Sequence, residues 1–130
     1  MKKILFLIAF VILSLLNGCK HATEPQKPDI YVNYEIESAF QDDSVKLTLD
    51  DKVLVDSRVT TNLTINLAWS SGLQKLTRSN HTLHFSVPDY RVQRDYTIDT
   101  ANDTSTVVLR FDKSTNQINI EQVKGMLLRL

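Results

Sequence analysis

Two pairs of adjacent acidic residues could bind a metal ion, judging by residue type and spacing. Asp42-Asp43 and Asp50-Asp51 sit at turn-like positions, and Ca²⁺ takes six to eight oxygen ligands, many of them carboxylates. The stretch 44–49 between the pairs alternates like a strand, which would be about 20 Å long at ~3.3 Å per residue. The two pairs therefore cannot share one ion. Asp42 and Asp43 are weak calcium candidates that would need ligands from another loop, and we expect no metal.

Histidine and serine residues give no pattern typical of an active site. His81 and His84 are three residues apart, so on a strand they point to opposite faces and cannot chelate together. No nucleophile-elbow pattern surrounds a serine, and the chain has only three glycines, none in a phosphate-binding loop. We predict no catalytic residue and no enzyme, with a small hydrolase as the distant alternative.

Three aromatic residues are candidates for ligand binding, because exposed rings can stack on a ligand. They are Trp69, Tyr90 and Tyr31. Burial in the core is the alternative for Trp69, which shares its parity with Ile65 and Leu67. The stretch 43–50 and the hairpin after it resemble segments of carbohydrate-binding modules and immunoglobulin-like β-sandwiches. This resemblance covers some fifteen residues and implies a sandwich that binds a glycan or a protein.

The N-terminus has the pattern of an export signal. Lys2 and Lys3 precede an apolar run over 4–16, which is too short to cross a ~30 Å hydrocarbon core as a helix. Its length and flanks are typical of a secretory signal. Cys19 is the only cysteine, so it cannot form a disulfide within one chain, and an odd cysteine in an exported protein needs another role.

The stretch Leu16-Asn17-Gly18-Cys19 resembles the lipobox of bacterial prolipoproteins, with Asn17 as the one departure, at the looser position. The resemblance implies cleavage between Gly18 and Cys19 and attachment of diacylglycerol and acyl chains to Cys19. Two such chains anchor a protein stably in a membrane. Lys20 follows the cysteine where an aspartate would imply inner-membrane retention, which favours the outer membrane. An uncleaved signal anchor is the alternative.

Composition narrows the class of partner. Without residues 1–18 the chain keeps 13 Lys and Arg against 15 Asp and Glu, a formal charge of −2. Nucleic-acid binding needs a clustered basic face, so we expect no nucleic acid. The expected partners are membrane lipid through Cys19 and either a glycan or another envelope protein. We expect no cofactor apart from the acyl chains on Cys19.

The elements after Cys19 divide into a tether and a strand-rich domain. Residues 19–29 are polar and contain two prolines, which predicts a flexible tether between lipid and domain. From residue 30 onward the hydrophobic period is two, which predicts strands. The predicted strands are 30–37, 45–49, 63–69, 82–87 and 106–111, with further strands near 53–58, 91–98, 117–122 and 126–129. The stretch 70–80 is predicted as a turn or a short helical turn.

Eight or nine short strands at this spacing predict an all-β fold, a small antiparallel β-sandwich over residues 30–130. In the hairpin at Asp50-Asp51, we expect a three-residue loop that pairs Leu49 with Val53 and Leu47 with Val55. We therefore expect a lipid-anchored bacterial envelope protein with a non-catalytic binding domain. A structural or accessory subunit of an envelope complex is the alternative.

Overall fold

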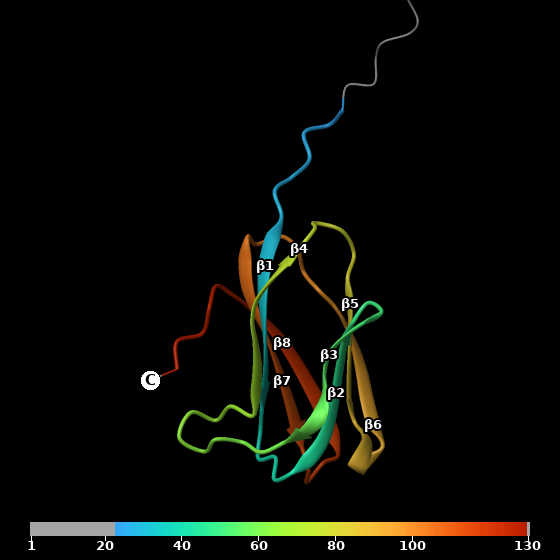
Figure 1. Ribbon diagram of the computed structural model, residues 1–130, viewed down its shortest axis with the longest axis vertical. Helices are drawn as coiled ribbons and strands as arrows, with labels where there is room; N and C mark the ends of the chain where they lie inside the picture. Colours follow the sequence, from blue (N-terminus) through green and yellow to red (C-terminus); the bar gives the residue numbers. More distant parts are fainter. Residues whose placement is uncertain (1–22, 130) are drawn as a thin grey trace, which may run out of the picture.

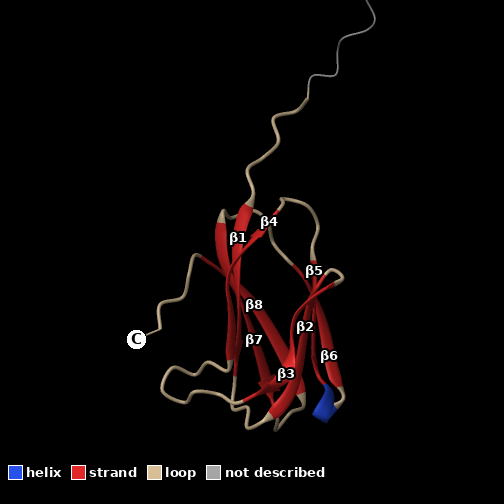
Figure 2. Ribbon diagram, in the orientation of Figure 1, coloured by secondary structure: helices blue, strands red, loops and turns tan. Residues whose placement is uncertain are grey.

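The computed structural model describes residues 23–129, in which eight strands form two four-stranded sheets packed face to face (Figures 1 and 2). This confirms the predicted small β-sandwich. The strands are β1 (Ile30–Glu37), β2 (Asp43–Leu49), β3 (Lys52–Val59), β4 (Trp69–Leu76), β5 (Thr82–Val87), β6 (Val92–Thr97), β7 (Thr104–Asp112) and β8 (Gln117–Lys124). One short 3₁₀ helix, η1 (Pro88–Tyr90), joins β5 to β6.

The first sheet has the order β4-β1-β7-β8 and the second the order β3-β2-β5-β6. All pairings are antiparallel except that of β1 with β7, which runs in parallel from Tyr31–Thr104 to Glu37–Arg110. The N-terminal strand therefore lies inside its sheet, between β4 and β7, rather than at an edge. β1 is therefore hydrogen-bonded along both of its edges, to β4 and to β7.

The core forms because the apolar residues of each strand alternate with polar ones. In β1 the side chains of Ile30, Val32, Tyr34 and Ile36 point between the sheets and are fully buried. Matching positions of β2, β5 and β7 complete the core, among them Val45, Leu47, Leu83, Phe85, Val107 and Leu109. Burial raises the pKa of Tyr34, whose hydroxyl has no hydrogen-bond partner among the described residues.

The prediction of a strand over residues 63–69 is wrong. Residues 60–68 form a loop closed by a single bridge between Asn62 and Leu67, and the strand begins only at Trp69. The apolar alternation misled the prediction because Leu63 is 82% exposed and faces no core. Instead β4 covers most of the predicted turn region, and it bulges beside β1 at Gly72, whose φ is +66°. The C-terminal residues 126–129, also predicted as a strand, form none.

The hairpin between β2 and β3 differs from its prediction in one respect. Leu47 pairs with Val55 as expected, but Leu49 pairs with Lys52 across the two-residue turn Asp50-Asp51. Asp50 adopts a φ of +52°, which a tight turn requires and aspartate tolerates. A bulge after Val53 shifts the register of β3 by one residue, so Leu47 still pairs with Val55. The shorter turn therefore does not move the apolar residues of the hairpin to the wrong face.

The predicted signal peptide, its cleavage site at Gly18 and the lipid attachment site Cys19 lie outside the described residues. Between residues 23 and 129, no helix is long and apolar enough to cross a membrane. Every strand of the described part lies within 30–124, and so does every residue of its core. A fragment of residues 20–130 therefore contains the complete sandwich and can be studied on its own.

Candidate functional site

The outer face of the first sheet is its most unusual surface, because the polar residues on it are buried. Residues 33, 35 and 37 of β1 point away from the core, since they alternate with its buried apolar residues. Yet Asn33, Glu35 and Glu37 are only 3–4% exposed. The corresponding outward residues in the middle of the second sheet, Lys46 and His84, are half-buried. We call Asn33, Glu35 and Glu37 the acidic row.

Neighbouring strands extend the acidic row into a network of charged hydrogen bonds. Glu35 accepts a bond of 2.9 Å from the Asn33 amide, and Arg110 of β7 donates Nε to Glu37 at 2.7 Å. The same Arg110 bonds Glu121 of β8 at 3.0 Å. Burial would lower the pKa of Arg110, but its bonds to the two carboxylates outweigh burial and raise that pKa. On the side of β7, the acidic row is therefore paired with one cation, the Arg110 guanidinium.

A second guanidinium reaches the acidic row from the C-terminal end of the chain. Arg129 donates Nη2 to both Glu35 and Glu37, and its Nη1 approaches the Ile65 carbonyl at 3.4 Å. Burial would lower the pKa of Arg129, but the bonds to both carboxylates raise it. Three carboxylates, counting Glu121, face two guanidiniums here, so the cluster has a formal charge of −1 and stays acidic.

Residues 125–129, which we call the C-terminal segment, cover this face. The segment leaves β8 at Gly125, whose φ is +80°; its N–H bonds Thr104 and its carbonyl bonds Thr106, both at 2.9 Å. Beyond Gly125, as far as residue 129, no backbone hydrogen bond holds the segment, and its only polar contacts are those of Arg129. Figure 1 shows the segment beside the first sheet, with the 60–68 loop below it. Arg129 therefore holds the C-terminal segment against the sheet, and we call this contact the latch.

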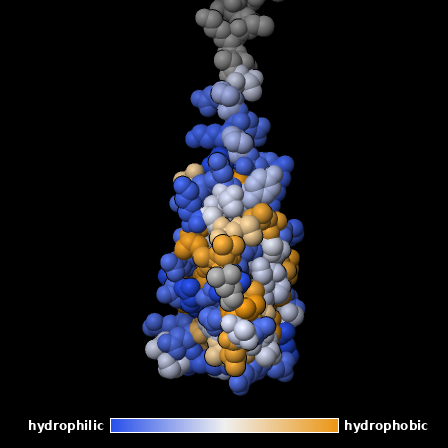
Figure 3. Space-filling view, turned by 90° about the vertical axis from the view of Figure 1, so that its left-hand side faces the viewer, coloured by the Kyte–Doolittle hydropathy of each residue, from blue (hydrophilic) through white to orange (hydrophobic). Residues whose placement is uncertain are grey.

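Exposed apolar side chains gather on the same side of the molecule. Six large apolar residues of the described chain are exposed: Tyr31, Val53, Leu63, Leu73, Met126 and Leu128. Tyr31 and Leu73 lie on the outer face of the first sheet, where Leu73 pairs with Asn33. Met126 and Leu128 belong to the C-terminal segment, and Leu63 to the loop that Arg129 contacts. Figure 3 shows apolar residues, in orange, along this side of the molecule. Of the six exposed residues, only Val53 lies on the second sheet.

The aromatic candidates are not brought together. Tyr31 pairs with Lys75 near the tether, while Trp69 pairs with Ile36 near the other end of the sheet and packs partly buried against the core. Tyr90 lies in η1 and packs on Phe111 with ring centroids 4.8 Å apart. Of the three, Tyr31 alone, at 44% exposed, offers an open ring, and it belongs to the apolar surface described above.

The acidic pair Asp42-Asp43 is occupied by the protein's own cations. Asp42 pairs with Arg58 at 3.2 Å, and Asp43 with Lys113 at 2.6 Å. Burial would raise the pKa of Asp43, but hydrogen bonds from Lys113 and from the Gln41 N–H lower it. Across residues 23–129 no group of three or more His, Cys, Asp or Glu side chains is arranged so that it could hold a metal ion.

His81 joins a trio that resembles a catalytic triad in outline. Its Nδ1 lies 2.8 Å from the Asp50 carboxylate and its Nε2 lies 3.2 Å from the Ser79 hydroxyl. The nearest atom to Nε2 is the Thr77 carbonyl oxygen at 3.0 Å, which can only accept a hydrogen bond. Nε2 is therefore shared between this carbonyl and the Ser79 hydroxyl rather than directed at the serine alone, as a general base would be. The trio ties the β4–β5 loop to the β2–β3 turn. Sequence analysis missed this contact because Asp50 and His81 are 31 residues apart.

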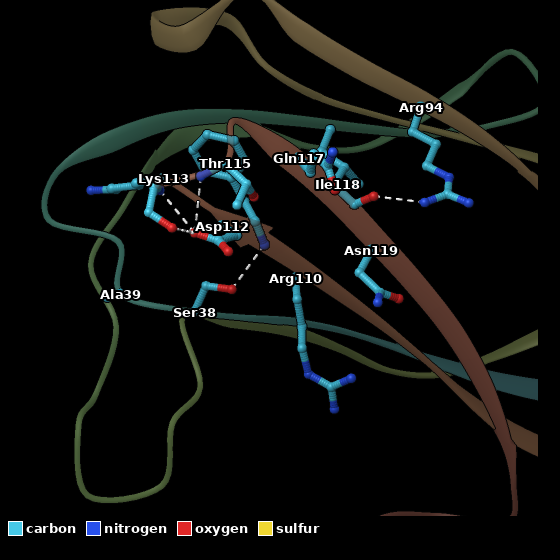
Figure 4. A pocket seen from close by; sticks show the side chains of 12 residues that line it. Ser38, Ala39, Arg94, Arg110, Asp112, Lys113, Thr115, Gln117, Ile118 and Asn119 are labelled. Atoms are coloured by element: carbon cyan, nitrogen blue, oxygen red, sulfur yellow. Dashed lines mark hydrogen bonds between the residues drawn. The ribbon is translucent and has the colours of Figure 1, made fainter.

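A cavity of about 620 Å³ opens at the end of the sandwich away from the tether, between the β1–β2 loop and the β7–β8 turn. Figure 4 shows that Arg94 and Arg110 point in different directions rather than toward a common point. Both are already engaged, Arg94 with the Ile118 carbonyl at 2.7 Å and Arg110 with Glu37. The cavity therefore lacks a convergent set of free polar groups.

Comparison with protein-family models and with curated proteins finds no match for this chain.

Proposed function

We propose that this chain is a lipid-anchored protein of the bacterial envelope, and that its sandwich binds another envelope protein through the outer face of the first sheet. The observation that carries the proposal is the gathering of five of the six exposed large apolar residues on that side. Apolar side chains that are exposed singly need no explanation, whereas a contiguous patch of them is typical of a protein-binding surface.

The position of the tether agrees with this assignment. Residues 23–29 leave the sandwich at the end where β1 begins, as Figure 1 shows. The apolar surface runs along the side of the sandwich, so a chain anchored through Cys19 would present it parallel to the tether. A protein that stands on the same membrane would meet this side without any obstruction by the anchor.

Site-specific photo-crosslinking in the native host tests the proposal. A photoreactive phenylalanine derivative replaces Leu73 or Tyr31 on the apolar surface, and Val53 on the second sheet provides a control of similar exposure. We expect one discrete envelope protein to be crosslinked from Leu73 and Tyr31 and not from Val53. Equal products from Val53, or none from the two test positions, would contradict the proposal. A product consisting of two copies of the chain would replace the envelope protein with self-association.

A further inference from the structure

The acidic row has the chemistry of a receptor for a guanidinium. Glu35 and Glu37 lie two residues apart on one face of β1, and each is at least 96% buried. Two buried carboxylates this close are stable only with a cation between them, because neither water nor distance screens their repulsion. Asn33 and Arg110 each satisfy one oxygen of the pair. The two remaining oxygens face the position where Arg129 sits.

The resident arginine uses this site incompletely. One nitrogen, Nη2, serves both carboxylates, and Nη1 reaches only a carbonyl at 3.4 Å. Its Nε is buried without a hydrogen-bond partner among the described residues. An arginine can donate five N–H bonds in a planar fork, and a bidentate arrangement on a carboxylate is stronger than a shared single donor. An arginine that approaches in another orientation can therefore compete with Arg129.

The C-terminal segment is bound in the manner of a peptide ligand. Leu127 and Arg129 face the sheet and are half-buried, while Met126 and Leu128 face solvent. The segment thus presents an apolar residue and an arginine two positions later to one face, which is the spacing of an extended chain. Since, within residues 126–129, only the Arg129 side chain makes polar contacts, detachment of the segment costs few interactions and opens the whole face.

We propose that the acidic row is the binding site for an extended segment of a partner protein that carries an apolar residue followed two positions later by arginine. The C-terminal segment occupies the same site in the free protein and must be displaced. The site with Arg129 removed has three carboxylates and one guanidinium, so its charge complements a cationic side chain. This inference rests on the proposed function, because the extended segment belongs to the partner protein that the first sheet is proposed to bind.

Peptide binding to residues 20–130 tests this directly. The probe is a fluorescent heptapeptide with the sequence of residues 124–130, Lys-Gly-Met-Leu-Leu-Arg-Leu, measured by anisotropy. It is titrated against the wild-type fragment and against Arg129→Ala, in which the latch is absent. We expect Arg129→Ala to bind the peptide at least about tenfold more tightly than wild type, because the resident segment no longer competes. A peptide with alanine in place of its arginine should lose at least about tenfold in affinity for Arg129→Ala.

Control variants separate this site from unspecific apolar binding. Glu35→Gln in the Arg129→Ala background should weaken the peptide, whereas Asp56→Asn, on an exposed ion pair of β3, should not. If Glu35→Gln does not fold, the peptide series still decides the outcome. Binding that ignores the peptide arginine, no binding to Arg129→Ala, or equal binding to wild type and Arg129→Ala would overturn the inference. Because the assay needs no natural partner, its failure is distinguishable from failure of the crosslinking experiment.

Discussion

Replacement of Arg129 by methionine provides the sharpest test of how the C-terminal segment is held. Methionine keeps an unbranched apolar stem and removes the guanidinium that bonds Glu35 and Glu37. If both carboxylates stayed buried without their partner, the free energy of unfolding would fall by about 3–5 kcal/mol. A solvent-exposed pair would be worth about 1 kcal/mol or less.

The structure places the expected value between these limits. The segment has no other polar contact after Gly125, so it can lift away from the sheet and admit water to the carboxylates. We therefore expect a loss of about 2 kcal/mol, which corresponds to a decrease in Tm of about 10 °C for a domain of this size. Urea unfolding of the 20–130 fragment, followed by tryptophan fluorescence and far-UV circular dichroism, measures the change.

Two controls make the result interpretable. Arg58→Met removes exposed pairs with Asp42 and Asp89, and its effect should stay within about 0.5 kcal/mol. A double-mutant cycle of Arg129→Met with Glu35→Gln should show a coupling energy above about 1 kcal/mol. A loss below about 0.5 kcal/mol for Arg129→Met would refute the latch. A loss of 4 kcal/mol or more would refute the idea that the segment lifts.

Three further predictions concern other parts of the chain. Hydrogen bonds from His81 and from the Thr82 N–H lower the pKa of Asp50. The stabilisation that the ionised Asp50 gives to the fold is therefore fully present above the unfolded pKa of about 3.9 and is lost as the pH falls through the lower pKa of the folded state. Asp50→Asn should therefore destabilise the fragment at pH 7 and much less at pH 3 in urea unfolding; equal losses at both would contradict this. Tyr34→Phe removes a buried hydroxyl without a partner among the described residues, so its Tm by calorimetry should stay equal or rise, and a fall of several degrees would reveal an overlooked bond. Cys19→Ala should abolish labelling of the chain by radioactive palmitate, and persistent labelling would refute the lipid anchor.

The sandwich could be predicted because alternation is a local signal that a buried face imposes on each strand. It succeeded for β1, β2, β5 and β7, which form the middle of the two sheets. It failed at Leu63, because an alternating loop and an alternating strand look alike until a neighbouring strand is known. The turn at Asp50-Asp51 was predicted, but its length was wrong, since the bulge after Val53 corrects the parity that a two-residue turn would disturb.

The candidate site could not be predicted, although the alternation of its polar residues with the apolar residues of β1 is visible in the sequence. Asn33, Glu35 and Glu37 have the pattern of the solvent-facing side of a strand, and that is the correct interpretation of β1 and β7 alone. The side chain that covers the two glutamates is that of Arg129, which lies 94 positions after Glu35 in the sequence. A single sequence contains no signal for a contact at that separation. Residues 126–129 were likewise predicted as a strand, because nothing local in their sequence shows that they leave the sheet.

The parallel pairing of β1 with β7 also sets the order in which the protein can fold. Glu37 and Arg110 are 73 residues apart, so a chain that emerges from its N-terminus exposes β1 first and completes its sheet last. The second sheet lies within residues 43–97 and can assemble earlier, starting from the β2–β3 hairpin. Contacts of such high sequence separation slow folding, because the loop must close before the contacts form. During that interval the edge of β1 that pairs with β7 is unpaired, and the protein then depends most on protection from aggregation.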